Sequence, residues 1–386
     1  MFFVAARMNR FKQIDILRAL AVFLVLGRHI TLCPSETSPF FHRVTEIWAQ
    51  GGWIGVDLFF VLSGFLVSGL LFREHEKYQK LHIGHFLIRR GFKIYPPFWL
   101  LIGVTILMWI VLHKPIPLPA LASELLFVQN YVRGMWNHTW SLAVEEHFYL
   151  LLAFGLFVLS KRRSARPFAL IPAGFILVAL LCLTLRILTG ALLPYRHMTH
   201  LVPTHLRLDG LFFGVFLSYL SHFHPVKFVA AASRFRHLLL ATGVGCLFPA
   251  FCLPLETPWI STFGFTLFYV GSGCLLVSAL GFRAPESRLF RAVAYVGSHS
   301  YSIYLWHMPV AIWGSAALAR LLSPNSNWYV DAAFYLVGSI AFGIAMAVFT
   351  EFPVLRIRDR FFPSRGTALS TDAMGRGINL SRVPSS

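Results

Sequence analysis

Long apolar stretches alternate with short polar loops along almost the whole chain. Each stretch is about as long as a helix that crosses a bilayer, so we predict an all-α membrane protein with about ten transmembrane helices. Tyr95-Pro96-Pro97 precedes the third stretch and is typical of a helix start. We expect a transmembrane domain over 1–353 and a basic, disordered cytoplasmic tail over 354–386. The predicted spans are 14–32, 53–72, 95–112, 140–160, 168–188, 205–221, 237–253, 259–280, 293–318 and 328–352.

The positive charges of the loops predict the orientation of these spans. Most loop Lys and Arg residues lie in the N-terminal segment, in every second loop and after the last span. Cytoplasmic loops carry such an excess, so we expect both termini to be cytoplasmic. The remaining loops contain only Arg43, Lys114, Arg133, Arg196 and Arg320.

The composition agrees with a multi-pass membrane protein. The 386 residues are 56% hydrophobic and 13% charged, and the mean hydropathy is +0.65. The net charge of +18 predicts no nucleic-acid partner, because the cations lie in short loops between apolar spans. The five cysteines show no CxxC spacing, so we expect neither a disulfide framework nor a metal site. The first span lacks a small-residue cleavage site and is predicted to be a retained anchor.

The first span carries two polar residues that are expected to share one face. Arg18 and His29 are eleven residues apart, which on a helix is about 16 Å along the axis and roughly 20° around it. An arginine in a membrane helix costs roughly 2.5–3.5 kcal/mol on insertion scales. We therefore expect both residues to face a polar interior of the bundle. A snorkelling arginine and a packing histidine are the alternative.

Four further spans place ionisable groups at a depth similar to that of His29. Isolated charges in lipid are costly, so we expect these groups to surround a wet cavity in the outer half of the membrane. Buried ion pairs that only join helices, such as Arg207 with Glu145, are the alternative. The residues are Asp57, Ser141, Glu145, Glu146, His147, Arg207, Asp209 and His307.

A second group of charges lies at the predicted cytoplasmic face. Arg89, Arg90 and Lys93 precede the third span, and Arg90 and Lys93 share a helical face. Together with Arg18 they could bind a multiply charged phosphate ligand. The alternative is that these residues only set the membrane topology.

Seven motifs in this order resemble the acyltransferase-3 family of integral membrane O-acyltransferases. The FFVLSGF and WSLAVEE blocks are the most specific of them, and the set covers about nine tenths of the chain. The motifs are Arg18 with His29, Gly55–Phe65 (GVDLFFVLSGF), Phe86–Pro96 (FLIRRGFKIYP), Trp140–Tyr149 (WSLAVEEHFY), Arg207–Gly210 (RLDG), Ser300–His307 (SYSIYLWH) and Glu351–Pro353 (EFP).

The resemblance implies transfer of an acyl group, usually acetyl, from cytoplasmic acyl-CoA to a hydroxyl outside. The implied acceptor is a carbohydrate or lipid-linked glycan such as O-antigen or exopolysaccharide, and the implied location is the bacterial inner membrane. Arg18 and His29 match the residues regarded as essential in the family. Arg90 and Lys93 match its basic motif, although the second position is usually arginine and lysine lacks the bidentate fork. Some members carry an extracytoplasmic hydrolase-like domain, and we expect this chain to act without one.

Depth and resemblance together suggest a mechanism. Coenzyme A phosphates would lie near Arg18, Arg89, Arg90 and Lys93, and the thioester would reach His29. His29 would act as general base, oriented by Glu145 or Asp57, or would carry the acyl group itself. Ser141, Arg207, Asp209 and His307 are candidates for binding the acceptor or holding the cavity. In the structural alternative, Asp209 pairs with Arg207 and His307 is a core residue, while Glu351 pairs with a loop arginine.

A transporter or flippase for a glycan or small molecule is the competing class of function. Charged groups near the middle of the membrane would suit a proton-coupled carrier. The absence of inverted repeats and paired broken helices argues against it. The identity of the acyl group, the acceptor and the oligomeric state do not follow from the sequence.

Overall fold

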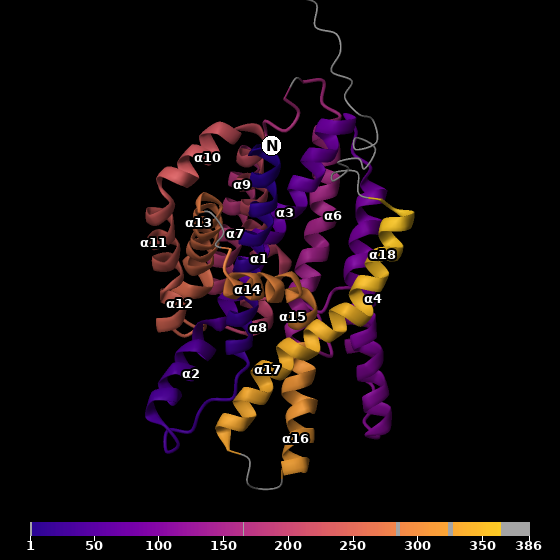
Figure 1. The fold of residues 1–386 in the computed structure, drawn as a ribbon, viewed down its shortest axis with the longest axis vertical. Helices are drawn as coiled ribbons and strands as arrows, with labels where there is room; N and C mark the ends of the chain where they lie inside the picture. The colour runs from indigo at the N-terminus through magenta and orange to yellow at the C-terminus, as the bar shows by residue number, and fades with distance from the viewer. Residues whose placement is uncertain (1, 165, 283–285, 323–326, 364–386) are drawn as a thin grey trace, which may run out of the picture.

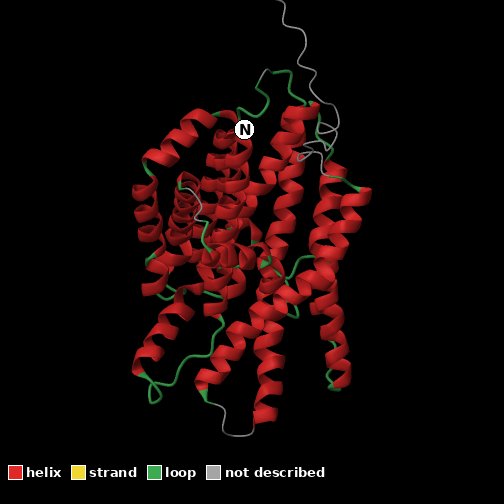
Figure 2. Ribbon diagram, in the orientation of Figure 1, coloured by secondary structure: helices red, strands yellow, loops and turns green. Residues whose placement is uncertain are grey.

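Helices make up the bundle seen in the computed structural model, which describes residues 2–164, 166–282, 286–322 and 327–363. No strand occurs in these residues, as Figure 2 shows. Most of the long helices run roughly along the vertical axis of Figure 1, whereas α17 runs diagonally across it. They are α1 (Phe2–Arg28), α3 (Gly55–Tyr78), α4 (Ile83–Val111), α6 (Trp140–Ser160), α7 (Ile171–Leu192), α9 (Leu208–Phe223), α11 (Arg236–Leu247), α13 (Phe265–Gly281) and α17 (Trp328–Met346).

Short helices connect or extend these long ones. Most of them lie where the sequence predicted loops or the ends of spans. They are α2 (Pro39–Gly51), α5 (Leu118–Leu125), α8 (His197–His200), α10 (Pro225–Arg234), α12 (Pro249–Cys252), α14 (Arg288–Ser298), α15 (Ser300–Pro309), α16 (Ser315–Leu322) and α18 (Phe352–Phe361).

Six helical segments in the described residues are long and apolar enough to cross a membrane. The number rises to seven if the pair Pro225–Arg234 and Arg236–Cys252, bent by 77°, counts as one span. The chain is therefore a multi-pass membrane protein, but ten spans are more than these criteria support. Two of the predicted spans are not among these six segments. The helix α1 carries the charged residues Asp15, Arg18 and Arg28, and α9 has only 16 residues.

The predicted ninth span, 293–318, is not one helix. It is divided at His299 into α14 and α15, and α14 packs across α1. A Cβ on Gly297 would collide with the backbone carbonyl of Asp15, so glycine permits this close crossing. α14 packs its Gly297 side against α1, while Arg288 and Arg291 remain at the surface.

The helix expected to start at Tyr95-Pro96-Pro97 starts twelve residues earlier instead. α4 continues through both prolines, which removes two backbone donors from the middle of the helix. The hydroxyl of Tyr301, on α15, donates to the carbonyl oxygen of Ile94 in this turn at 2.7 Å. This hydrogen bond joins α15 to α4 at the turn that contains both prolines.

Close helix packing holds α3 against α9 beside the site. Gly64 on α3 and Gly214 on α9 face each other, and a Cβ on either would collide with a backbone carbonyl of the opposite helix. Small residues at such positions let membrane helices approach closely. This contact fixes α3, which contributes one wall of the cavities described below.

The predicted disordered tail begins with a helix. Residues 354–361 belong to α18, which lies beside α4 in Figure 1. Arg89 of α4 binds Asp359 at 3.0 Å and donates to the carbonyl oxygen of Phe362. The first residues of the predicted tail are therefore helical and contact α4. The rest of the predicted tail, 364–386, lies outside the described residues.

A buried carboxylate anchors the loop between α4 and α6. Glu124 is fully buried, and its carboxylate accepts from the Trp136 backbone N–H and the Thr139 hydroxyl, each at 3.0 Å. Burial raises the pKa of Glu124 to about 7, although these hydrogen bonds oppose the shift. The sequence reading did not single out Glu124, which fixes the loop that carries His138.

Candidate active site

A cavity of about 190 Å³ lies among α1, α3, α4, α6 and α15. We call it the Arg18 cavity. Its charged lining residues are Arg18, Arg90, Lys93 and Glu145, and its remaining polar lining includes Ser63, Ser141, Tyr149, Ser300, Tyr301 and Tyr304. The basic residues predicted to bind phosphate thus come together, with the exception of Arg89.

Arg18 and Arg90 keep donors free for a ligand. Arg18 makes one long ion pair with Asp15, at 3.4 Å. Arg90 has no ion pair among the described residues, and its guanidinium lies 5.6 and 5.5 Å from the ring centres of Phe86 and Tyr149. Cation–π contacts hold a guanidinium in place while leaving its N–H donors available. These two arginines are the strongest candidates for binding an anion.

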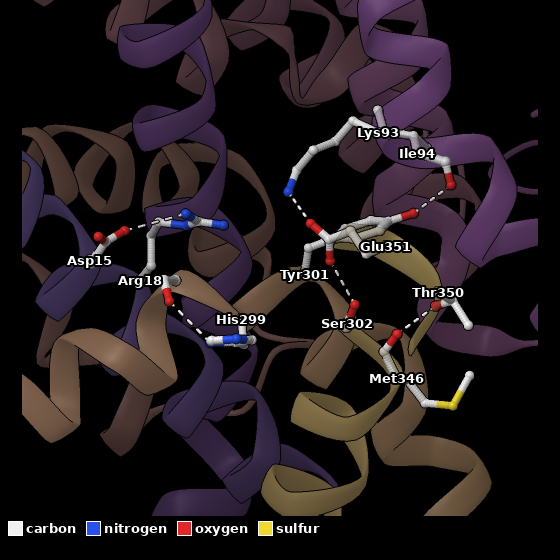
Figure 3. Close-up of polar contacts among 11 residues, drawn as sticks. Asp15, Arg18, Lys93, Ile94, His299, Tyr301, Ser302, Met346, Thr350 and Glu351 are labelled. Atoms are coloured by element: carbon white, nitrogen blue, oxygen red, sulfur yellow. Dashed lines mark hydrogen bonds and ion pairs between the residues drawn. The ribbon is translucent and has the colours of Figure 1, made fainter. Parts of the chain in front are cut away.

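Lys93 is already paired. It extends from α4 to the carboxylate of Glu351, whose other oxygen accepts from the Ser302 hydroxyl at 2.7 Å, as Figure 3 shows. Glu351 is fully buried. The sequence reading placed Glu351 with a loop arginine, but the structure pairs it with Lys93. Lys93 therefore lines the Arg18 cavity with much of its charge balanced.

Glu145 belongs to a hydrogen-bonded group in the Arg18 cavity. The hydroxyls of Ser63 and Tyr149 both donate to the Glu145 carboxylate, the former at 3.2 Å. The two hydroxyls also contact each other at 2.9 Å. No recorded hydrogen bond joins Glu145 to His29, so the predicted orienting role has no support in this geometry. Ser63 of the GVDLFFVLSGF motif is part of this polar group.

A second cavity, of about 440 Å³, contains His29. We call it the His29 cavity. Its polar and aromatic lining residues are Arg28, His29, Trp53, Arg133, Asn137, His138, Trp140, His197 and Tyr304. His29 lies in the turn directly after α1, and its backbone N–H donates to the carbonyl oxygen of Leu26 at 3.2 Å. Arg18 and His29 therefore do face the interior of the bundle, in two different cavities.

The two cavities share Val56 and Tyr304 as lining residues. The Tyr304 hydroxyl donates to the carbonyl oxygen of His138 and lies 2.7 Å from the hydroxyl of Ser141. Ser141, a predicted acceptor-binding residue, thus lines the Arg18 cavity and holds the tyrosine at the boundary. The phenol ring marks the place where a group entering one cavity would meet a group in the other.

His29 belongs to a cluster of three imidazoles. The ring centre of His307 lies 5.2 Å from that of His29 and 5.0 Å from that of His138. His307 is fully buried, its Nδ1 lies 2.6 Å from the carbonyl oxygen of Tyr304, and its Nε2 has no partner among the described residues. No group of three His, Cys, Asp or Glu residues able to hold a metal ion occurs in the described part of the chain.

The remaining charged candidates form buried ion pairs. Arg207 binds Asp57 at 2.7 Å and lies 4.0 Å from the ring centre of Phe265. Asp209 is bound at 2.6 Å by Arg186, a fully buried arginine of α7 that the sequence reading did not single out. Asp57, Arg207, Asp209 and His307 line neither cavity. Asp57 therefore contacts Arg207 and not His29. Arg207 and Asp209 do form buried ion pairs, as the alternative expected, but Arg207 pairs with Asp57 in place of Glu145 and Asp209 pairs with Arg186 in place of Arg207.

Several site residues could not be named from the sequence. Tyr149, Tyr301 and His138 line or border the cavities. The sequence indicates them only through their place beside a motif, since Tyr149 is the last residue of the WSLAVEEHFY block and His138 lies two residues before it. Arg89, by contrast, was named, but it binds α18 and is absent from the lining of both cavities.

These features define a helical membrane protein with a cationic cavity and a histidine cavity that share Val56 and Tyr304 as lining residues. The chain matches the family model described as an acyltransferase domain, Acyl_transf_3, over residues 11–348. It therefore belongs to the acyltransferase-3 family, in agreement with the resemblance of its motifs. No solved structure matches the chain.

Curated relatives share this region. The chain is 28% identical over 363 residues to the peptidoglycan O-acetyltransferase OatA of Listeria monocytogenes, covering 86% of this chain and 54% of that protein. It is 27% identical over 299 residues to the O-acetyltransferase OatA of Staphylococcus aureus, covering 70% and 48%. The putative peptidoglycan O-acetyltransferase YrhL of Bacillus subtilis is 27% identical over 332 residues, covering 78% and 48%. The chain thus spans about half the length of these relatives.

Proposed function

We propose that the protein is a membrane O-acyltransferase that moves an acyl group, most simply acetyl, from acyl-CoA to a carbohydrate hydroxyl. The cavity arrangement carries this proposal, because Arg18 and Arg90 line one cavity, His29 lines the other, and Val56 and Tyr304 line both. The acyl donor would enter the Arg18 cavity from the cytoplasm of a bacterial cell. The acceptor would enter the His29 cavity from the opposite side of the inner membrane.

The phosphates and the pantetheine arm of acyl-CoA would bind to different parts of the Arg18 cavity. Guanidinium groups suit phosphate because they donate two parallel hydrogen bonds, so Arg18 and Arg90 would bind the charged groups. The Arg18 cavity, at about 190 Å³, is smaller than a drug-sized ligand site. The nucleotide would therefore remain at the mouth, while the narrow pantetheine arm would carry the thioester toward Tyr304.

His29 would then act on the acceptor. Its imidazole takes the proton of the acceptor hydroxyl as the oxygen attacks the thioester carbonyl carbon. The C–S bond breaks, the ester forms, and the imidazolium returns the proton to the leaving sulfur. In the two-step variant His29 first takes the acyl group from sulfur and then passes it to the hydroxyl. Both routes require the two cavities to connect at Tyr304.

Cell-wall glycan is a candidate acceptor besides O-antigen and exopolysaccharide. Two of the relatives are named for peptidoglycan O-acetylation. The test is incubation of the purified protein in nanodiscs with radiolabelled acetyl-CoA and a set of soluble glycans, including peptidoglycan fragments. Label in a glycan, lost in His29→Ala, is the expected result. Uptake of a glycan into vesicles without transfer of label would instead support the transporter alternative.

A further inference from the structure

The charged lining of the His29 cavity is entirely positive. Arg28 and Arg133 line it, and neither Asp nor Glu is among its lining residues. The Arg18 cavity differs in this respect, because Glu145 lies among its cations. Both arginines of the His29 cavity are exposed, so they contact whatever enters from that side.

Neither arginine forms an ion pair with a carboxylate of the described residues. Arg28 uses one guanidinium nitrogen, Nη1, to donate to the carbonyl oxygen of Ala49 at 2.9 Å. This bond orients the group without cancelling its charge. Arg133 forms no ion pair with another described residue. Burial and the nearby charge of Arg28 lower the pKa of His197, so His197 contributes a neutral imidazole near pH 7.

Aromatic residues of the same cavity suit a sugar ring. Trp53 and Trp140 line it, and both are buried. The Trp53 indole N–H has no hydrogen-bond partner among the described residues, which leaves a buried donor at the cavity wall. Aromatic faces with a few polar groups are common in sites that bind small polar molecules. Arg28 and Arg133, which line the same cavity, would in addition favour a ligand that carries a negative charge.

We propose that the acceptor is an anionic glycan, with a negative charge close to the hydroxyl that is acylated. The charge is a carboxylate on the sugar or a phosphate that links the glycan to a lipid carrier, and Arg28 and Arg133 bind it. The proposal rests on the proposed function, because it assigns the acceptor of the same site. It also gives a function to the positive charge of Arg28, the residue directly before His29 in the sequence.

Matched acceptors test this proposal. The first pair is a hexuronic-acid oligosaccharide and the same oligosaccharide with its carboxyls reduced to alcohols. The second pair is a neutral oligosaccharide, free or carried on a polyprenyl phosphate. Transfer of label from acetyl-CoA is measured in nanodiscs of zwitterionic lipid, and binding of each acceptor is measured separately without donor. The variants are Arg28→Gln with Arg133→Gln and, as a control for surface charge, Arg320→Gln, which is exposed and lines neither cavity.

We expect wild-type protein to prefer the charged member of one pair by about tenfold in KM and in binding. The double variant should narrow this ratio to about threefold or less, and Arg320→Gln should leave it unchanged. A preference within the first pair of acceptors would identify the bound charge as a sugar carboxylate, and a preference within the second pair would identify it as the lipid-linked phosphate. Equal use of charged and neutral acceptors, or an equal loss in Arg320→Gln, would overturn the proposal and leave the enzyme activity standing. Charge-dependent binding with no label transfer would support the anionic ligand and refute the acyltransferase function.

Discussion

The imidazole of His307 lies 5.2 Å, centre to centre, from that of His29, with the two ring planes tilted by 45°. Nδ1 of His307 lies at hydrogen-bond distance from the carbonyl oxygen of Tyr304, and a carbonyl only accepts. The proton therefore resides on Nδ1, and Nε2 presents a lone pair inside the histidine cluster. Asp57 and Glu145, the carboxylates predicted to orient His29, bind other residues.

Replacing His307 tests whether it positions His29. In His307→Asn the amide can keep the hydrogen bond to the Tyr304 carbonyl but loses the Nε2 acceptor. We expect kcat to fall by about 10- to 100-fold, less than the roughly 10²–10⁴-fold cost of losing a general base, while KM for acetyl-CoA changes little. Steady-state kinetics with each substrate varied would show this split. A kcat within twofold of wild type would assign His307 to packing alone.

Arg89 and Arg90 are neighbours in sequence with different predicted effects on donor binding. Arg90 lines the Arg18 cavity, whereas Arg89 binds Asp359 of α18. Arg90→Ala should raise KM for acetyl-CoA by about 10- to 100-fold because a charge-assisted contact to phosphate is lost. Arg89→Ala, the matched control, should change it less than about threefold. Equal effects of the two substitutions would count against the Arg18 cavity as the donor site.

The Arg186–Asp209 pair should matter for stability. Both side chains are buried, so Arg186→Leu leaves an uncompensated carboxylate and should cost about 3–5 kcal/mol. The double variant Arg186→Leu with Asp209→Leu removes both charges and should recover most of this loss. Thermal unfolding in detergent, followed by size-exclusion fluorescence, measures the order of the three proteins. A double variant less stable than Arg186→Leu would show that the pair does not act through charge burial.

The raised pKa of Glu124 should make the free energy of unfolding depend on pH. Its pKa is raised by burial from 4.5 to about 7, so the folded state holds the proton more tightly than the unfolded state. The associated stability is complete below about pH 4.5 and is lost as pH rises through about 7, a difference of about 3 kcal/mol. Glu124→Gln resembles the protonated form and should flatten the fall in Tm between pH 5 and 8. An unchanged pH profile in this variant would contradict the assignment.

The local apolar pattern predicted most helices but not how they break or pair. The predicted span 140–160 coincides with α6, and the spacing of Arg18 and His29 correctly indicated that both face the interior. The break at His299 was missed because an apolar run does not distinguish an amphipathic helix lying across α1 from a spanning one. The continuation of α4 through Pro96 and Pro97 was missed because a proline pair is locally typical of a helix start, and packing with distant helices cannot be read from the local pattern.

Pairing of charges was the least predictable part of the site. Depth along the spans correctly selected Asp57, Arg207 and Asp209 as buried polar residues. Which charge binds which depends on helix rotation and packing, and depth carries no information on either. Arg186 was overlooked because it stands alone in an apolar span, and that isolation was itself a signal of a buried partner.

In the proposed mechanism an acyl group crosses from the Arg18 cavity to His29 at Tyr304. The most direct measurement supplies labelled acetyl-CoA to one face of sealed vesicles and recovers an acceptor glycan from the other. We predict label in the glycan with wild-type protein and none with His29→Gln, although that variant still binds acetyl-CoA with wild-type affinity. Labelled glycan on the far side with His29→Gln, at a rate near that of wild type, would contradict the claim.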